Sequence, residues 1–234
     1  MRTSRWMGLV GVLLLSGCWN GVDGSGERVE EVKALSGFTA VDNRCELDVL
    51  VERGDTFGVV VSIDDDLQEL VEVSVVGDTL RIDTSENIGD HVPGPSVRVT
   101  LPALRAATVS GSGDLHAFQF LESSPVELQV SGSGDVDYDG SAPQLTARVR
   151  GSGDLHVRGS TERLQAEVNG SGDLDARELV ASSASLSVDG SGDLTATVHG
   201  PTDARISGSG DIDVFGSAVL GNTSVRGSGD LHVH

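Results

Sequence analysis

The tetrapeptide Gly-Ser-Gly-Asp occurs seven times in the second half of the chain, and this repeat constrains the fold more than any other feature. The copies begin at Gly111, Gly132, Gly151, Gly170, Gly190, Gly208 and Gly227, which gives steps of 21, 19, 19, 20, 18 and 19 residues. A period near 19 residues is typical of a solenoid, in which each repeat forms one layer that packs on its neighbours. The sequence therefore predicts that residues 106–234 form a stack of similar layers.

Apolar residues hold fixed places on both sides of each tetrad. The residue two places before the first glycine is always valine or isoleucine: Val109, Val130, Val149, Val168, Val188, Ile206 and Val225. The residue after each aspartate is also aliphatic: Leu115, Val136, Leu155, Leu174, Leu194, Ile212 and Leu231. A third apolar residue follows two places later, with a polar residue between them, and this alternation is that of a strand with one buried face. Each repeat is expected to supply two short strands joined at the tetrad, in an all-β solenoid of parallel strands at ~4.8 Å per layer.

The tetrads are interpreted as structural turns. Glycine reaches the backbone torsions of a sharp corner, and an aspartate beside it can accept hydrogen bonds from the amides of its own turn. The residues assigned to these turns are Gly111, Gly113, Asp114, Gly132, Gly134, Asp135, Gly151, Gly153, Asp154, Gly170, Gly172, Asp173, Gly190, Gly192, Asp193, Gly208, Gly210, Asp211, Gly227, Gly229 and Asp230.

Calcium binding is the alternative interpretation of the same residues. Known calcium-binding β-rolls recur every nine residues, whereas this period is near 19. Each tetrad also supplies one carboxylate, while calcium takes six to eight oxygen ligands. The scaffold interpretation is therefore favoured, and calcium is kept as the less favoured cofactor.

Other patterns that resemble metal or catalytic sites are weak. Residues 135–140 read DVDYDG, like the start of an EF-hand loop, but the twelfth position is Thr146 instead of glutamate. His116 and His156 fall two layers apart, roughly 10 Å, which is too far to share one metal ion. Most acids of the repeat region belong to the repeat itself, and no nucleophile is paired with a base. We predict no metal site and no enzymatic activity; a polysaccharide-active enzyme is the less favoured alternative.

The first residues have the pattern of a secretory signal. Arg2 and Arg5 precede an apolar run that ends near Leu15, and residues 15–18 read LSGC, which resembles the bacterial lipobox. We predict a signal peptide over residues 1–17, lipidation of Cys18, and a place in the bacterial cell envelope at the outer membrane. Whether the domain faces the periplasm or the exterior is left open. The polar, glycine-rich residues 18–34 are expected to form a flexible tether.

Residues 35–105 have strand patterns of a different kind and are predicted to form a β-region that caps the solenoid. Cys45, Leu47, Val49 and Val51 alternate with polar residues, and a hairpin turn is expected around Gly77. Because Cys45 is the only cysteine besides Cys18, we expect a small buried residue and no intramolecular disulfide.

The charge balance limits the partners. With 16 basic and 36 acidic residues, the chain has a net charge of −20, which excludes nucleic acid as a partner because phosphates would be repelled. The expected partners are the membrane, through the N-terminal lipid, and a protein, a glycan or a second copy at the end or a face of the solenoid, since solenoid ends expose strand edges.

A strand region ending in LPAL at residues 101–104, followed by serial GSGDL and GSGDV repeats, resembles the GIN head domain of autotransporter adhesins. The resemblance covers about residues 35–234. It implies a right-handed parallel β-helix, carried on secreted or lipid-anchored proteins. On this basis we expect an adhesin-like or binding surface without catalysis, with a structural or regulatory envelope scaffold as the alternative.

Overall fold

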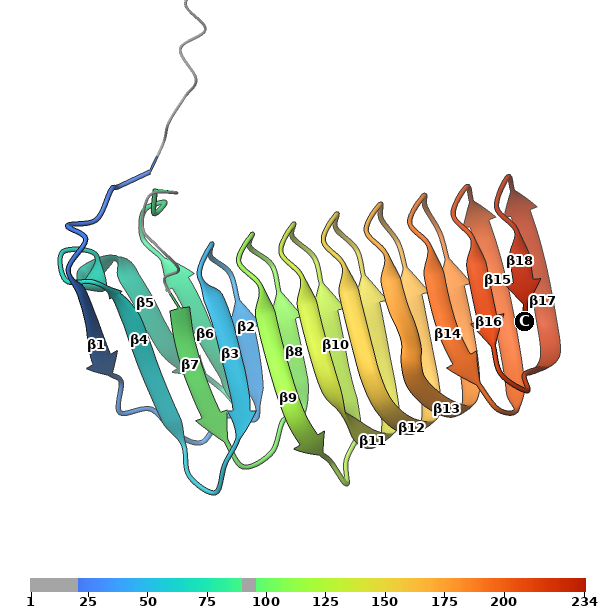
Figure 1. Ribbon diagram of the computed structural model, residues 1–234, viewed down its shortest axis with the longest axis horizontal. Coiled ribbons are helices and arrows are strands. Elements are labelled where there is room, and N and C mark those ends of the chain that lie inside the picture. Colours follow the sequence, from blue (N-terminus) through green and yellow to red (C-terminus); the bar gives the residue numbers. More distant parts are fainter. Residues whose placement is uncertain (1–20, 90–95) are drawn as a thin grey trace, which may run out of the picture.

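The computed structural model describes residues 21–89 and 96–234, and most of them form strands wound into an elongated stack (Figure 1). One 3-10 helix, Gln68–Leu70, lies in the N-terminal part of the chain. The predicted all-β solenoid is therefore confirmed. No helix within the described ranges is long and apolar enough to span a bilayer.

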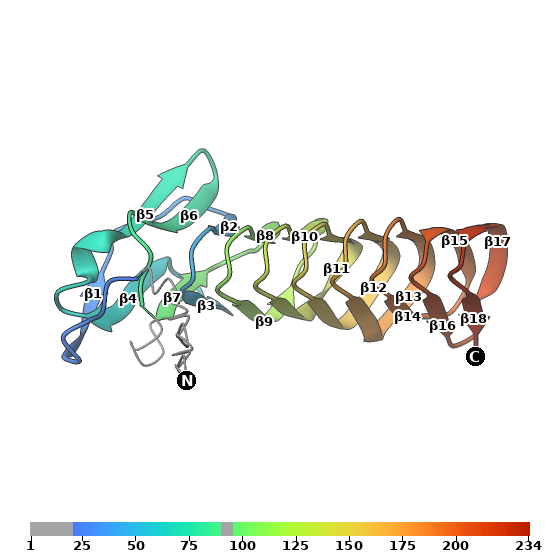
Figure 2. The ribbon, with the colours of Figure 1, turned by 90° about the horizontal axis from the view of Figure 1, so that it is seen from above.

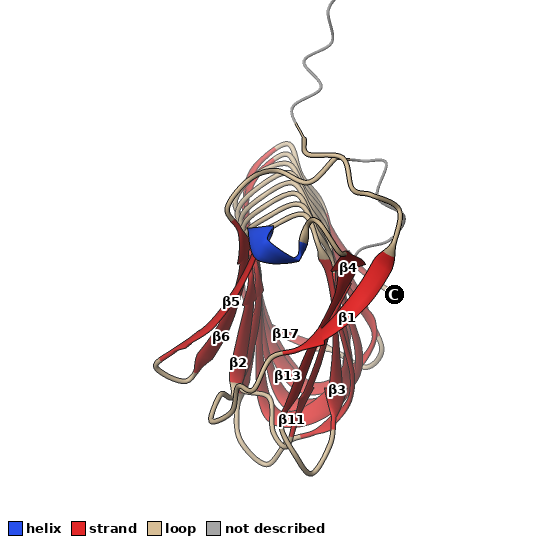
Figure 3. Ribbon diagram, turned by 90° about the vertical axis from the view of Figure 1, so that its left-hand side faces the viewer, coloured by secondary structure: helices blue, strands red, loops and turns tan. Residues whose placement is uncertain are grey.

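Each tetrad joins two strand segments that lie on opposite faces of the stack (Figure 3). We call the segments that precede the tetrads the first face and the segments that follow them the second face. The strands of the repeat region are β8 (Ala106–Val109), β9 (Leu115–Leu121), β10 (Val126–Val130), β11 (Val136–Val149), β12 (Leu155–Val168), β13 (Leu174–Val188), β14 (Leu194–Val198), β15 (Pro201–Gly208), β16 (Ile212–Phe215), β17 (Val219–Gly227) and β18 (Leu231–Val233). Strands β11, β12 and β13 are long because each begins on the second face and bends into the first face of the next layer.

All neighbouring strands of the repeat region are parallel, and equivalent residues lie above one another. Val149 pairs with Val168 on the first face, for example, and Leu155 pairs with Leu174 on the second. The predicted inward columns are buried between the two faces through most of the stack. In the last layer Val225 and Val233 are each 47% exposed, because this layer has a neighbour on one side only within the described chain.

Variation in repeat length is absorbed away from the tetrads. The register between β9 and β11 shifts after Phe118, where Gln119 has a φ of 65°. A second shift lies between β12 and β13, after His156. Two more lie between β13 and β14 after Ala176 and between β15 and β17 after Thr202. The irregularities lie towards the bend that joins the second face to the next layer, so the tetrads stay aligned although the repeat steps vary.

The N-terminal region continues the same stack for two more layers. Its strands are β1 (Arg28–Val32), β2 (Ala40–Asn43), β3 (Asp48–Arg53), β4 (Gly58–Asp64), β5 (Val71–Val76), β6 (Thr79–Thr84) and β7 (Ser96–Leu101). Strands β2 and β3 form the layer that supports β8 and β9, and strands β6 and β7 form the layer on the other side of β2 and β3. The chain thus forms an inner layer first with β2 and β3, then adds the outermost layer with β6 and β7. It then crosses to the other side of β2 and β3 to form β8 and β9.

Antiparallel strands complete this end of the molecule. Strand β4 pairs with β7 and β1, and β5 forms with β6 the hairpin expected around Gly77 (Figure 2). The predicted tether over residues 18–34 is wrong for its second half. Arg28–Val32 is a strand, Val22 forms a bridge with Ile88, and the amide of Gly26 donates a hydrogen bond of 2.6 Å to Asp64. Close packing explains Gly24, where a Cβ would collide with the Asp64 side chain, and a positive φ of 83° explains Gly26.

Candidate functional site

The seven tetrads stack directly on one another along one edge of the molecule, which we call the tetrad edge (Figure 3). The amide of Ser152 donates a hydrogen bond of 3.0 Å to the carbonyl of Gly132 in the preceding layer, and the amide of Gly153 donates one of 3.3 Å to the same oxygen. The same pair of bonds recurs between other layers, for example from Ser171 and Gly172 to Gly151. The turn is therefore a repeating, hydrogen-bonded part of the scaffold.

The tetrad glycines are required by close stacking more than by unusual torsions. A Cβ built on Gly153 would lie against the carbonyl of Gly134, and one on Gly134 against that of Gly113, closer than side chains approach in real structures. Among the tetrad glycines, only Gly208 and Gly227 have a left-handed φ, at 151° and 125°. The predicted reason, access to strained torsions, is thus corrected: the layers approach too closely for any side chain to fit.

The tetrad aspartates form a continuous ladder. Each carboxylate except that of Asp230, in the last layer, accepts a hydrogen bond from the amide of the aspartate in the next layer. The donor therefore comes from a neighbouring layer and not from the turn's own amides as predicted. The donor–acceptor pairs and N–O distances are Asp135 to Asp114, 2.8 Å; Asp154 to Asp135, 2.7 Å; Asp173 to Asp154, 2.8 Å; Asp193 to Asp173, 2.8 Å; Asp211 to Asp193, 2.8 Å; and Asp230 to Asp211, 2.7 Å.

The hydrogen bonds of this ladder offset the electrostatic repulsion between its carboxylates. Carboxylates ~4.8 Å apart repel by about 0.9 kcal/mol in water and about 3.5 kcal/mol at an effective dielectric constant of 20. A hydrogen bond to a charged group contributes about 1.5–3 kcal/mol, which offsets repulsion of that size. Within residues 21–89 and 96–234, no group of three or more His, Cys, Asp or Glu side chains is arranged to hold a metal ion.

Sequence reasoning missed one further layer of the ladder. Asp48 accepts a hydrogen bond of 3.1 Å from the amide of Asp114, and Cys45 and Leu47 occupy the places of the two tetrad glycines. Asn43 stands at the place of the column valine, where its amide group donates to the carbonyls of Leu47 at 2.8 Å and Gly113 at 3.1 Å. The available signal was the aspartate followed by alternating apolar residues in DVLV at 48–51.

Cys45 is a buried free thiol, as predicted. It is 4% exposed, and its Sγ lies 3.4 Å from Oδ1 of Asn43. Burial raises the pKa of the thiol to about 12. The group is therefore protonated at neutral pH and is not a reactive thiolate. Cys18, the predicted lipidation site, and the predicted signal peptide over residues 1–17 lie outside the described residues.

The second face presents a polar column whose members pair in register: His116, Asp137, His156, Asp175, Thr195, Asp213 and His232. His116 Nδ1 lies 2.9 Å from a carboxylate oxygen of Asp137. Asp137 and Asp139 face outward, whereas Tyr138 is fully buried, and burial raises the pKa of its hydroxyl. The resemblance to an EF-hand therefore has no structural counterpart, because these acids belong to a strand.

A small stack of rings extends this face near the last layers. The Arg177 guanidinium lies 4.6 Å above the centre of the Phe215 ring, and the Phe215 and His234 rings stack at 4.4 Å. His234 Nε2 also lies 2.8 Å from a carboxylate oxygen of Asp213. These contacts tie the exposed side chains of β13, β16 and the residue after β18 to one another.

The fold and the tetrad edge together define a class of protein. It is a parallel β-solenoid in which each layer has a glycine turn, and the turns stack and are linked by aspartate side chains. Residues 37–218 match the family described as "Putative auto-transporter adhesin, head GIN domain". The chain belongs to this family.

Solved structures share the fold. A "putative adhesin" from Bacteroides fragilis NCTC 9343 has a TM-score of 0.81 and 21% sequence identity, over 92% of this chain and 100% of that one. A "putative lipid binding protein" from Parabacteroides distasonis ATCC 8503 has a TM-score of 0.73 and 22% identity, over 92% and 100%. A "putative adhesin" from Parabacteroides merdae ATCC 43184 has a TM-score of 0.68 and 18% identity, over 92% and 99%. A search of the curated proteins finds no match.

Proposed function

We propose that this chain is a lipid-anchored protein of the bacterial cell envelope that presents its solenoid as an adhesin-like binding surface and carries out no catalysis. The observation that carries the proposal is the rigid stack itself: two long faces of ordered outward side chains on the fold of an adhesin family. The signal-like residues 1–17 and the lipobox-like LSGC that ends at Cys18 support the membrane attachment. The outer membrane is the proposed location.

The short distance between Cys18 and the folded domain supports a close attachment. Val22 is bound to the domain by its amide, which donates 2.9 Å to the carbonyl of Asn87, and by its carbonyl, which accepts 2.9 Å from Gly89. Cys18 precedes Val22 by four positions, and four extended residues span at most ~14 Å. A lipid on Cys18 would therefore hold the N-terminal end of the stack near the bilayer.

Detergent partitioning of the full chain in its bacterial host tests the attachment. We expect the natural chain to enter the detergent phase with a mass that includes the acyl chains, and Cys18→Ala to stay in the aqueous phase. The core residues of the described chain all lie after position 21, so the substitution is expected to leave this core unaffected. A natural chain that partitions like Cys18→Ala would contradict the anchor.

A binding screen tests the adhesin-like role. The chain lacking residues 1–18 retains every core residue of the part that the structure describes. It is offered to glycans and envelope proteins, with and without calcium. We expect binding that does not depend on calcium. Failure to bind any component would favour the structural or regulatory scaffold, and binding that requires calcium but not magnesium would restore the calcium interpretation.

A further inference from the structure

Two adjoining hollows lie on the first face, over strands β12, β13, β15 and β17. Their volumes are about 510 and 500 Å³, and both are lined by Ser185 and Asp203. The first hollow extends to Arg163 and Gln165, and the second extends to Arg205. Together they form one continuous depression, which we call the β13 trough.

Differences in side-chain length between layers create the trough. The outward residues of β13 on this face are Ser183, Ser185 and Ser187. The layer before it carries Arg163, Gln165 and Glu167 at the same positions, and the layer after it carries Asp203 and Arg205 opposite Ser185 and Ser187. Short side chains between two rows of long ones leave a channel along β13. Its walls are two layer spacings apart, ~9.6 Å, and its three serines span ~13 Å along the strand.

Several polar groups of the trough are held in place by other residues. Asp203 Oδ1 accepts hydrogen bonds from the Asn222 amide at 2.6 Å and from its side-chain nitrogen at 3.3 Å, which leaves the second carboxylate oxygen free. The Ser183 hydroxyl donates 3.1 Å to the carbonyl of Glu162. Glu167 contacts Arg148 at 3.4 Å. The acceptors are thus positioned before any ligand arrives.

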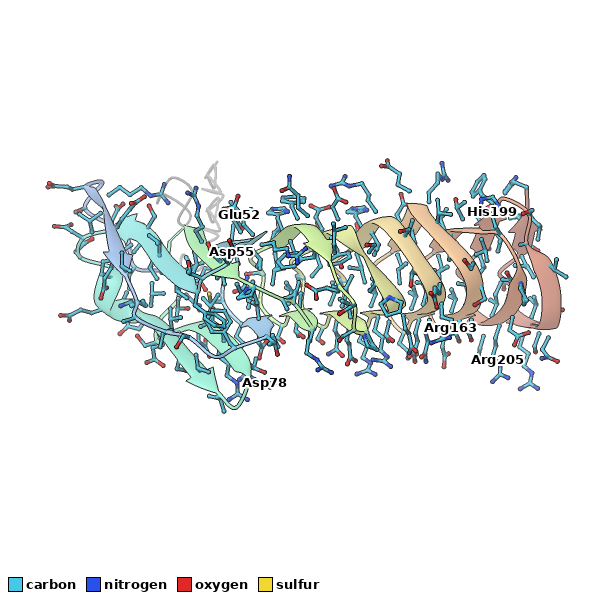
Figure 4. The ribbon with its side chains drawn as sticks, turned by 90° about the horizontal axis from the view of Figure 1, so that it is seen from below. Glu52, Asp55, Asp78, Arg163, His199 and Arg205 are labelled. Atoms are coloured by element: carbon cyan, nitrogen blue, oxygen red, sulfur yellow. The ribbon has the colours of Figure 1, made fainter. Side chains whose placement is uncertain are left out.

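The two arginines of the trough are open to a ligand. Arg163 and Arg205 are exposed and project from the same side of the molecule (Figure 4). Across the described chain, neither forms a salt bridge with a carboxylate. A guanidinium binds a carboxylate through two parallel hydrogen bonds, which gives the trough two places for an acidic group.

The lining favours a sugar chain over a peptide. Leu164 and Leu186 point into the core, and the apolar side chains left in the trough are the small Ala184 and Pro201, so hydroxyl, amide and charged groups make up most of its lining. An extended peptide also has no strand edge to pair with, because β13 is already paired on both sides. A chain of hydroxyl groups whose few carboxylates lie at the two trough arginines matches this surface, whereas the net charge of −20 would repel an evenly charged polyanion.

We propose that the β13 trough binds an acidic oligosaccharide that lies along β13. Arg163 and Arg205 bind sugar carboxylates near the two ends of the trough, and Gln165, Asp203 and the serine floor bind hydroxyl groups. This site rests on the proposed function as a binding surface and specifies both the position and the class of ligand.

Calorimetric titration tests the site with the chain lacking residues 1–18 at 0.15 M salt. The probes are a galacturonic acid tetrasaccharide, a hyaluronan tetrasaccharide, a neutral galactose tetrasaccharide and a tetraglutamate peptide. We expect at least one acidic sugar to bind, with an affinity at least tenfold higher than that for the neutral sugar or the peptide. Absence of binding to both acidic sugars, or equal binding of neutral sugar or peptide, would overturn the proposal.

Substitutions locate the binding. Arg163→Gln and Arg205→Gln should each weaken the acidic sugar at least tenfold, and Ser185→Gln should do so by filling the trough. Arg158→Gln, on the second face, is the matched control and should change the affinity less than twofold. Melting temperatures confirm that each variant folds. An acidic sugar that binds all three trough variants as tightly as the natural chain would refute the trough while leaving the wider binding function intact.

Discussion

At the scale of single residues, the tetrad aspartates link neighbouring layers by hydrogen bonds, which their position in a turn did not predict. The sequence predicted that seven carboxylates would stand in file, and the structure confirms the file. It could not show which amide each carboxylate binds, because the donor belongs to another layer about 19 positions away. Asp48 was not recognised as part of the ladder because its layer lacks the two glycines of the tetrad.

Substitution of Asp154 should separate hydrogen bonding from charge. Asp154→Asn keeps an oxygen that can accept the Asp173 amide and removes repulsion from two neighbours, so we expect a change in unfolding free energy within about 1 kcal/mol. Asp154→Ala leaves that amide without an acceptor and should cost about 1–3 kcal/mol. Urea denaturation measures both. Equal losses for the two variants would show that the negative charge, and not the acceptor, matters.

The buried thiol of Cys45 predicts how the stability of the fold changes with pH. Its pKa is raised to about 12 in the fold, whereas an unfolded thiol ionises near pH ~8.5. Above that pH the unfolded chain loses the proton that the folded chain retains, so stability should fall as pH rises, by up to about 1.4 kcal/mol per pH unit for this group. Denaturation between pH 8 and 10 should show a steeper loss for the natural residue than for Cys45→Ala. Parallel slopes would contradict this account of the buried thiol.

At the scale of elements, the strands and turns of the repeat were predictable because every layer repeats the same local pattern. The inward columns of valine and leucine predicted which residues are buried, and the hairpin around Gly77 was recognised. The placement of β6 and β7 beyond β2 and β3 was not predictable, because no local pattern encodes which layer a strand joins. The strand Arg28–Val32 was missed because its acidic, exposed residues resemble a linker.

The turn element itself can be tested through its glycines. A methyl group at Gly153 would meet backbone atoms of Gly134 in the layer below, which cannot move without disturbing the ladder. We expect Gly153→Ala to cost about 1–3 kcal/mol, the range of overpacked sites. Gly58→Ala is the matched control, because its nearest neighbour, a Thr100 side chain, lies at an ordinary 3.6 Å, and it should change stability by less than about 1 kcal/mol. Equal effects in urea denaturation would argue against stacking as the reason for the tetrad.

At the scale of the whole molecule, the functional regions were only partly accessible from sequence. The acidic tetrad edge follows directly from the repeat. The β13 trough could not be predicted, because it depends on three serines of one layer lying between longer side chains of two others. Its three-dimensional form depends on the register between layers, which the unequal repeat steps obscure.

The exposed strand edge of the last described layer favours association between molecules. Strand β17 has a neighbour on one side only within the described chain, and Val219 and Val225 are 65% and 47% exposed. Free strand edges with apolar residues favour pairing with another chain, and lysine on such an edge opposes it. We expect the chain lacking residues 1–18 to form dimers with increasing concentration in light scattering, and Val225→Lys to remain monomeric. Val32→Lys, on β1 at the other end, is the control; a strictly monomeric natural chain would contradict the prediction.

Strands β2 and β3 lie between strands that come later in the chain, and this order affects how the protein folds. A chain that emerges N-terminus first produces β2 and β3 before β6 and β7, which cover one side of them, and before β8 and β9, which cover the other. Contacts between such distant segments form slowly, since a long loop must close first. The N-terminal layers are therefore complete only once β9, which ends at Leu121, has been made.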